Sequence, residues 1–249
     1  QFEEKPKRSK SNLASMGIYI FDREFLVSLL KQLESKYDAL DFGKHVIPYL
    51  VSRRQVSAFP YKGYWLDIGT IKSYYLASLD LLSDRPRMRL HNRRSPVLSA
   101  PDDRAPFIVS GEADLRNSLV CNGCVISGSV RSSILSPGVR VGRGATVADS
   151  ILFDDCVVEE NAVVKGVIMD KRCVVGHRAR VGVGKASVPN ALQPSYLNSG
   201  ITLVGKGTVI PPLVRIGTNC LVSGSGADGA IPNADIGDGG YYLADEERL

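Results

Sequence analysis

Two features that would place a protein in or across a membrane are missing from this sequence. No stretch approaches the roughly 18 consecutive apolar residues that a membrane-spanning helix requires. The first ten residues, QFEEKPKRSK, lack the apolar core of a signal peptide. We therefore expect neither a secreted nor a membrane-spanning protein, and no membrane partner.

Cysteine is scarce as well. The chain has five cysteines among 249 residues, an odd number that argues against a disulfide framework. This usage is typical of a reducing compartment, so we expect a cytoplasmic location. Cys121 and Cys124 form a single CxxC pair, whereas a zinc site needs a second pair or histidine ligands. We expect both to point into the protein interior, as Cys156 and Cys173 should.

Neither sign of charge is in large excess. The 31 lysines and arginines against 26 acidic residues give a net charge of +5. One local exception is residues 85–94, RPRMRLHNRR, which hold five arginines and no acidic residue and precede a proline-rich polar segment. No aromatic residues alternate with the arginines, as they would in many nucleic-acid-binding segments. We predict a solvated linker over residues 85–116 and no nucleic-acid partner.

Residues 1–84 alternate short apolar runs with amphipathic stretches, which is the pattern of an α/β domain. Strands are predicted at residues 13–21, 55–59 and 64–67. Helices are predicted to follow three N-capping residues, Asp22, Asp41 and Thr70. So few strands indicate the closing part of a larger sheet domain.

A repeat of about 17 residues defines the rest of the chain. Aliphatic residues recur with a step of six within each group of three and a step of five between groups. They are Leu135, Val141 and Val147, then Leu152, Val158 and Val164, then Met169, Val175 and Val181. An α-helix cannot use this period, whereas a left-handed parallel β-helix places one inward aliphatic residue on each hexapeptide side. We predict such a β-helix over residues 117–249, with an excursion near residues 185–200.

The order of the motifs resembles one family. The EKP of residues 4–6, LASMGIYIF (13–21), DFGKHVIP (41–48), YWLDIGT (64–70) and the hexapeptide coils follow one another as in the glucose-1-phosphate adenylyltransferases, or ADP-glucose pyrophosphorylases. YWLDIGT alone would indicate only the wider class of sugar-nucleotide pyrophosphorylases. DFGKHVIP together with ASMGIY narrows the resemblance to the ADP-glucose branch.

The resemblance implies a fold and an activity. Residues 1–84 would be the carboxyl-terminal part of the α/β nucleotidyltransferase domain. The enzyme would transfer AMP from ATP to glucose 1-phosphate, giving ADP-glucose and pyrophosphate for glycogen or starch synthesis. It would use Mg²⁺ as its cofactor and would form a homotetramer. The family's glycine-rich, nucleotide-binding signature precedes EKP, and nothing like it occurs in this sequence. We therefore expect the ATP-binding half to be missing and the isolated chain to be inactive.

The resemblance also implies site residues. Lys5 would contact the sugar phosphate, Glu4 would bind sugar hydroxyls, and Ser15 would lie against the glucosyl group. Asp67 would help to hold Mg²⁺, so that Asp67 and Lys5 carry the catalytic roles. These residue types suit the chemistry, because a lysine and a carboxylate-bound Mg²⁺ neutralise and align phosphate groups.

The densest basic stretch of the repeat, DKRCVVGHRAR (170–180), is a candidate effector site. It resembles the region where plant members of the family bind an anionic activator, with Lys171 at the position of the activator lysine. Clustered cations suit phosphate oxygens. The predicted effector site comprises Lys171, Arg172, His177 and Arg178, and a solvated coil face is the competing interpretation.

Two other functions remain open from the sequence. In a hexapeptide-repeat acyltransferase, His177 would be the general base and an acyl-CoA the partner, but EKP and YWLDIGT would then be unexplained. The chain could also be a non-catalytic regulatory or assembly subunit of the same family.

Overall fold

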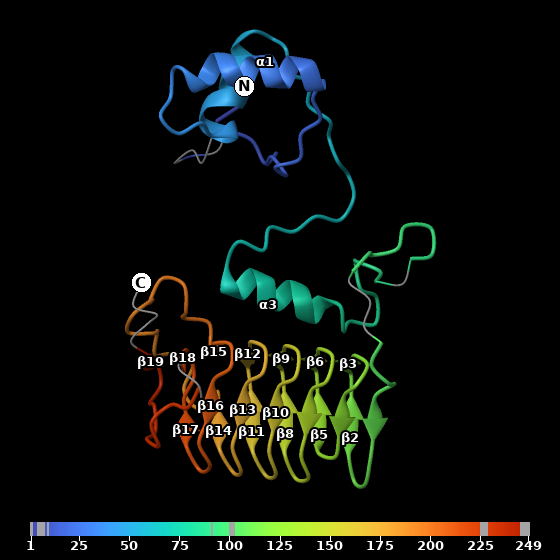
Figure 1. Ribbon diagram of the computed structural model, residues 1–249, viewed down its shortest axis with the longest axis vertical. Coiled ribbons are helices and arrows are strands. Elements are labelled where there is room, and N and C mark those ends of the chain that lie inside the picture. Colours follow the sequence, from blue (N-terminus) through green and yellow to red (C-terminus); the bar gives the residue numbers. More distant parts are fainter. Residues whose placement is uncertain are drawn as a thin grey trace. The chain divides into compact units, whose positions relative to one another are not determined.

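The computed structural model describes residues 2–3, 8, 10–90, 92–99, 103–224 and 229–244. The chain divides into two compact units, Gln1–Trp65 and Leu66–Leu249. Figure 1 colours them along the sequence, from blue to red.

The first unit is built from short helices. It contains α1 (Arg23–Glu34), a π-helical turn η1 (Phe42–Val46) and α2 (Ile47–Ser52). Asp22 Oδ1 accepts a hydrogen bond from the Phe25 N–H at 2.9 Å, and Asp41 Oδ1 accepts one from the Lys44 N–H at 2.7 Å. These are the N-caps that the sequence predicted. The buried core of this unit is formed by Leu29, Leu33, Val46 and Leu50.

The strands predicted in the first 84 residues are not formed. Among the described residues before Ile108 the chain has helices, turns and extended segments, but no paired strand. In the segment 13–21, Leu13 is 80%, Ile18 71% and Ile20 97% exposed. A strand needs a neighbour to satisfy its backbone N–H and C=O groups, and no described segment provides one. The apolar residues that the predicted sheet would bury therefore face outward.

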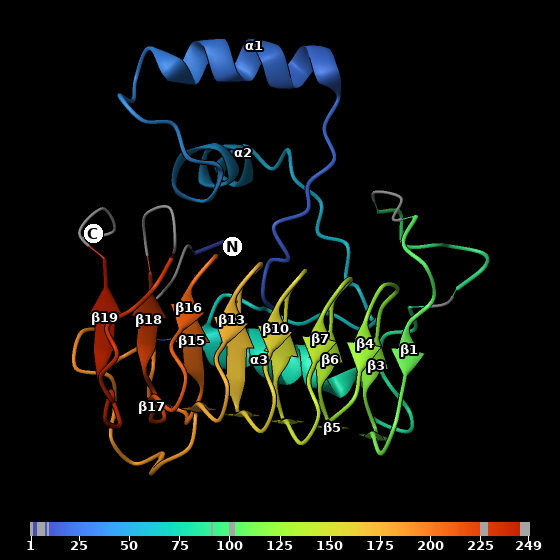
Figure 2. The same ribbon diagram turned by 60° about the horizontal axis from the view of Figure 1, so that its bottom comes forward.

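The second unit begins with α3 (Ile71–Asp80), capped as predicted by Thr70. Thr70 Oγ1 accepts a hydrogen bond from the Ser73 N–H, and Ser73 Oγ accepts one from the Thr70 N–H, both at 3.1 Å. The Tyr75 hydroxyl donates to the Asp149 carbonyl at 2.6 Å, which anchors α3 to the strands that follow (Figures 1 and 2). Partial burial raises the pKa of Tyr75 to about 12, so this donor keeps its proton at neutral pH.

Three parallel sheets wind around one core. Sheet A contains β1 (Ile108–Val109), β4 (Val125–Ile126), β7 (Arg140–Val141), β10 (Val157–Val158), β13 (Val174–Val175) and β16 (Val209–Ile210). Sheet B contains β2 (Asp114–Arg116), β5 (Ser129–Arg131), β8 (Thr146–Ala148), β11 (Val163–Lys165), β14 (Arg180–Val181) and β17 (Arg215–Ile216). Sheet C contains β3 (Leu119–Val120), β6 (Ile134–Leu135), β9 (Ile151–Leu152), β12 (Val167–Met169), β15 (Thr202–Val204), β18 (Leu221–Ser223) and β19 (Tyr241–Leu243).

The register confirms the repeat. Val158 pairs with Val141 and with Val175, each 17 residues away, and the pairings are parallel. The nine aliphatic residues that define the period are all buried in one core. The parallel β-helix is thus confirmed. Its first strand, β1, begins at Ile108, ahead of the predicted start at residue 117, because Ile108 pairs with Val125 one coil later.

The cysteines divide between core and surface. Cys124, Cys156, Cys173 and Cys220 are buried, whereas Cys121 is exposed. The prediction that Cys121 points inward is wrong, because it follows β3 where the chain turns a corner towards β4. Among the described residues, no group of three or more His, Cys, Asp or Glu side chains is arranged to hold a metal ion.

A loop without strands separates β14 from β15, and two buried asparagines hold it. Asn190 Nδ2 donates to the carbonyls of Asn219 and Gly240, at 2.9 and 3.0 Å. Asn190 Oδ1 accepts hydrogen bonds from the Leu192 and Gln193 N–H groups. Asn219 Nδ2 in turn donates to carbonyls at the start of the loop, those of residues 186 and 188.

We expect Asn190→Leu to lower the free energy of unfolding by about 2–3 kcal/mol, because buried backbone groups lose partners that an apolar side chain cannot replace. Asn198, an exposed asparagine of the same loop, provides the control. Its amide donates to the Pro194 carbonyl near the surface, so Asn198→Leu should change stability much less. Chemical denaturation of both variants measures the difference, and equal losses would contradict this role for Asn190.

Candidate functional site

The sugar-phosphate elements are described only in part. Glu4 and Lys5 lie outside the described residues. Ser15 is exposed, and its Oγ accepts a hydrogen bond from the Gly17 N–H at 3.2 Å and lies 3.1 Å from the Tyr19 hydroxyl. The Ser15 hydroxyl is therefore fixed by a local turn, with Gly17 in the left-handed conformation at φ +71°.

Asp67 lies just before α3, in the second unit. Its Oδ1 accepts a hydrogen bond from the Gly69 N–H at 2.9 Å, and a Cβ at residue 69 would lie 3.1 Å from the same oxygen. The helix cap is Thr70, so Asp67 is not needed for that purpose. The structure thus presents an exposed carboxylate held in a tight turn. Such a group fits Mg²⁺, which takes one or two protein carboxylates and completes its shell with water and phosphate oxygens.

The predicted effector residues fall into two groups at opposite edges of sheet A. Lys171 and Arg172 lie at the corner that leads from sheet C into β13, whereas His177 and Arg178 lie at the corner that leads from β13 to sheet B. The β13 strand separates the two pairs. They do not form one cluster, because residues six apart stand on successive sides of a triangular coil.

The first corner mixes cations and carboxylates. Lys171 Nζ lies 3.0 Å from Asp154 Oδ2. Arg104 forms two hydrogen bonds to the Asp155 carboxylate, at 2.6 and 3.0 Å. The hydrogen bond from Arg104 holds the pKa of Asp155 below its usual range, with a further contribution from the charge of Arg172. Sequence reasoning missed Arg104, because it lies in the segment predicted to be a solvated linker.

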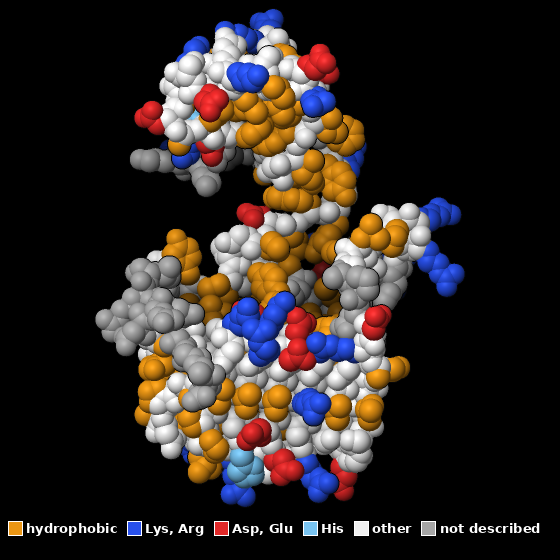
Figure 3. Space-filling view, in the orientation of Figure 1, with side chains coloured by type: hydrophobic (Ala, Val, Ile, Leu, Met, Phe, Trp, Pro, Cys, Tyr) orange, Lys and Arg blue, Asp and Glu red, His pale blue; other side chains and the backbone are white. Residues whose placement is uncertain are grey.

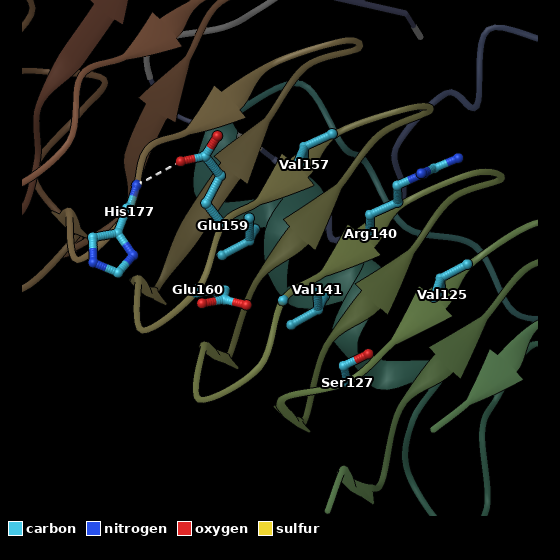
Figure 4. A pocket seen from close by; sticks show the side chains of 10 residues that line it. Val125, Ser127, Arg140, Val141, Val157, Glu159, Glu160 and His177 are labelled. Carbon is cyan, nitrogen blue, oxygen red and sulfur yellow. Dashed lines mark hydrogen bonds between the residues drawn. The ribbon is translucent and has the colours of Figure 1, made fainter. Parts of the chain in front are cut away.

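The second corner borders a shallow hollow of about 410 Å³ on sheet A. Its lining includes Ser127, Arg140, Glu160 and His177 (Figure 4). The His177 N–H donates to Glu159 Oε2 at 2.8 Å, so the backbone of His177 is tied to the preceding coil. This corner therefore sets His177 and Arg178 close to two carboxylates, Glu159 and Glu160, which offset the positive charge that an anionic effector would need.

Comparisons with known proteins agree with the motifs. A family described as nucleotidyl transferase matches residues 1–84, and a GlmU-like, C-terminal hexapeptide family matches residues 109–204. Glucose-1-phosphate adenylyltransferase of Thermomicrobium roseum is 43% identical over 240 residues, which are 96% of this chain and 56% of that protein. The chain is a relative of the glucose-1-phosphate adenylyltransferases. The enzyme of the same name from Acetivibrio thermocellus is 38% identical over 224 residues, 89% of this chain and 52% of the relative.

The aligned region makes up most of this chain but only part of each relative. The enzyme of the same name from Fervidobacterium nodosum is 34% identical over 98% of this chain but only 58% of its own length. The chain thus spans a little over half the length of these relatives. They are named adenylyltransferases, which does not favour the acyltransferase alternative. None of the described helices has the length and apolar character needed to cross a membrane.

Proposed function

We propose that the chain forms the carboxyl-terminal part of a glucose-1-phosphate adenylyltransferase. The reaction transfers AMP from ATP to glucose 1-phosphate, giving ADP-glucose and pyrophosphate for glycogen or starch synthesis. The observation that carries the proposal is the match of both parts of the chain, a nucleotidyl transferase segment and a hexapeptide β-helix, to relatives with that name. We further propose a cytoplasmic homotetramer.

The proposed site follows the chemistry of phosphate groups brought together. Lys5 supplies a positive charge to the sugar phosphate, while Glu4 and Ser15 bind the glucosyl part. Asp67 would hold Mg²⁺, which neutralises and aligns the phosphates when bound. The contribution of these residues is positioning and electrostatics, since the attacking oxygen belongs to the substrate.

A chimera tests the proposal directly. The amino-terminal part of the Thermomicrobium roseum enzyme that this chain does not match would be joined in frame to Gln1. We expect the chimera to form ADP-glucose from ATP and glucose 1-phosphate, and the 249-residue chain alone to form none. A folded chimera without activity, alongside an active parent enzyme, would contradict the proposed function.

For regulation, we propose the Lys171 corner as the place where an anionic metabolite acts. The support is the group of cations at this corner, Lys171, Arg172 and Arg104, which lie close to two carboxylates of the coil before. A phosphorylated effector would compete with Asp154 for Lys171. His177 and Arg178 belong to the proposed site only if the effector spans the width of sheet A.

We expect Lys171→Ala in the chimera to raise the concentration of phosphorylated activator needed for half-maximal activation about tenfold, the effect of losing one charge-assisted hydrogen bond. Lys165→Ala is the matched control, since Lys165 is also an exposed lysine of the β-helix but lies on sheet B. Activation curves with a panel of phosphosugars and phosphoacids provide the measurement. Unchanged activation in Lys171→Ala would place the effector elsewhere.

A further inference from the structure

The residues proposed to bind substrate and metal are divided between the two compact units. The boundary between the units falls between Trp65 and Leu66. Ser15 therefore belongs to the first unit, whereas Asp67 belongs to the second unit together with α3 and the β-helix. The position of the Asp67 carboxylate thus depends on what holds this part of the chain in the second unit.

The turn that contains Asp67 is joined to α3 by consecutive hydrogen bonds. Asp67 Oδ1 accepts a hydrogen bond from the Gly69 N–H, and Thr70 and Ser73 exchange the two hydrogen bonds of a capping box. The Tyr74 N–H donates to the Thr70 carbonyl at 2.9 Å. A capping box fixes the direction in which the chain enters a helix. The Asp67 carboxylate therefore follows the position of α3.

The helix α3 lies along sheet C but is not buried there (Figures 1 and 2). None of its residues is fully buried, and Leu76 is 55% exposed. Figure 3 shows hydrophobic side chains at the surface over this helix. Apolar contacts are non-directional, so they do not by themselves fix how far a helix is rotated or shifted along its axis. A directional contact is what would fix α3 on the β-helix.

Tyr75 makes such a contact. Its hydroxyl donates to the Asp149 carbonyl at 2.6 Å, which joins residues 74 apart in the sequence. Within the part of the chain that the structure describes, no other side chain of α3 forms a hydrogen bond to the β-helix. The rotation and axial position of α3 are therefore set at this one point.

The acceptor belongs to a well-connected corner of the β-helix. Asp149 lies between β8 and β9 in the left-handed conformation, at φ +48°, and its N–H donates to the Arg131 carbonyl at 3.1 Å. At the next residue, the Ser150 N–H donates to Ser133 Oγ at 3.1 Å. Ser150 Oγ accepts a hydrogen bond from the Val167 N–H at 3.2 Å, so three successive coils are linked here. The Asp149 carbonyl is thus a fixed point for Tyr75.

We propose that Tyr75 is a positioning residue for the adenylyltransferase reaction, because its hydrogen bond to the β-helix holds α3 and thereby sets where the Asp67 carboxylate lies. Tyr75 itself would touch neither substrate nor metal. A displacement of about 1 Å caused by a change far from the reacting atoms can cost about 100-fold in rate. Since Asp67 acts only in an intact enzyme, this proposal rests on the proposed function.

Tyr75→Phe in the chimera tests the effect on catalysis. We expect turnover to fall about tenfold and the Mg²⁺ concentration for half-maximal activity to rise about threefold, because Asp67 is then less well placed to hold the ion. The Michaelis constant for glucose 1-phosphate should change less than about twofold, since the residues proposed to bind it precede Trp65 in the sequence. Partial unfolding alone would lower turnover and leave the Mg²⁺ dependence unchanged.

Tyr74→Phe is the matched control. Tyr74 is half-buried, as Tyr75 is, but its hydroxyl forms no hydrogen bond with any residue that the structure describes. Removal of this hydroxyl should leave turnover and Mg²⁺ dependence as in the wild-type chimera. Equal changes in the two variants would overturn the role given to Tyr75.

A double-mutant cycle tests whether Tyr75 acts through Asp67. In a chimera that already carries Asp67→Asn, we expect Tyr75→Phe to lower turnover less than about twofold, because the carboxylate that it positions is gone. The same tenfold loss in both backgrounds would show that Tyr75 acts by another route, which overturns the proposal.

Hydrogen exchange on the 249-residue chain tests the anchor without any activity. We expect the amides of α3 to exchange at least about fivefold faster in Tyr75→Phe than in the wild type, because a helix without its anchor opens more easily. The amides of β17 should exchange at unchanged rates. Unchanged exchange in α3 overturns the proposal even if the chimera is active. Faster exchange in α3 together with an inactive wild-type chimera would instead contradict the proposed function.

Discussion

We expect Val164→Asp to unfold the central coils of the β-helix. Val164 lies on β11 between Val147 and Val181, and its side chain is fully buried in the core. An aspartate at this position would have no partner for its charge. Burying an unpaired charge is among the most destabilising effects of a single substitution, so we expect the free energy of unfolding to fall by about 4 kcal/mol or more. Each coil is stabilised mainly by its neighbours, so the coils on both sides should lose order together.

Val163→Asp, at the preceding residue, provides the matched control. Val163 belongs to the same strand but faces outward between Thr146 and Arg180. The carboxylate of an aspartate at this position would stay in water, so we expect the free energy of unfolding to change by less than about 1 kcal/mol. Thermal melts followed by circular dichroism compare the two variants. Equal melting temperatures would contradict the assignment of inward and outward positions.

The second large effect concerns Asp67→Asn in the chimeric enzyme. We expect turnover to fall roughly 100-fold or more, because a bound metal ion contributes several kcal/mol to phosphoryl transfer and this variant removes a charged ligand. The Mg²⁺ concentration needed for half-maximal activity should rise as well. Steady-state rates measured across a series of Mg²⁺ concentrations give both quantities.

Two further variants make the Asp67 result specific. Asp84→Asn removes an exposed carboxylate after α3 and should leave the kinetics unchanged. Lys5→Ala should act mainly by raising the Michaelis constant for glucose 1-phosphate, because a contact to the ground-state phosphate is lost. Normal turnover and normal Mg²⁺ dependence in Asp67→Asn would show that the role transferred to this residue is wrong.

The repeat could be predicted because each coil meets only its neighbours. A residue such as Val158 occupies the same environment as Val141 and Val175, its partners on the neighbouring coils. The spacing of aliphatic residues in the sequence therefore predicts that it is buried. The helix caps at Asp22 and Thr70 were predictable for a similar reason, since a cap depends on a hydrogen bond three residues away. Local patterns of this kind require no knowledge of distant contacts.

Where the outcome depends on distant contacts, the sequence was a poorer guide. The segment 13–21 has the composition of a strand, yet a strand exists only beside a partner, and the described chain provides none. The pairing of Arg104 with Asp155 joins residues 51 apart in the sequence. No repeat in the sequence relates these two positions, so the pairing could not be predicted. The basic stretch at residues 170–180 is divided between two corners because each coil of the β-helix is triangular in cross-section. The order of the cations along the sequence does not reveal this division.

The loop between β14 and β15 shows how such a fold can vary during evolution. Val174 pairs with Val209, 35 residues away, although the three coils before it, at β7, β10 and β13, follow one another at intervals of 17 residues. The parallel pairing continues on both sides of the loop. Eighteen extra residues have therefore been accommodated at one corner without displacing a single strand. Corners of the β-helix are sites where insertions and deletions can accumulate. Lineages can therefore acquire new surface loops there while the stacked coils keep their dimensions.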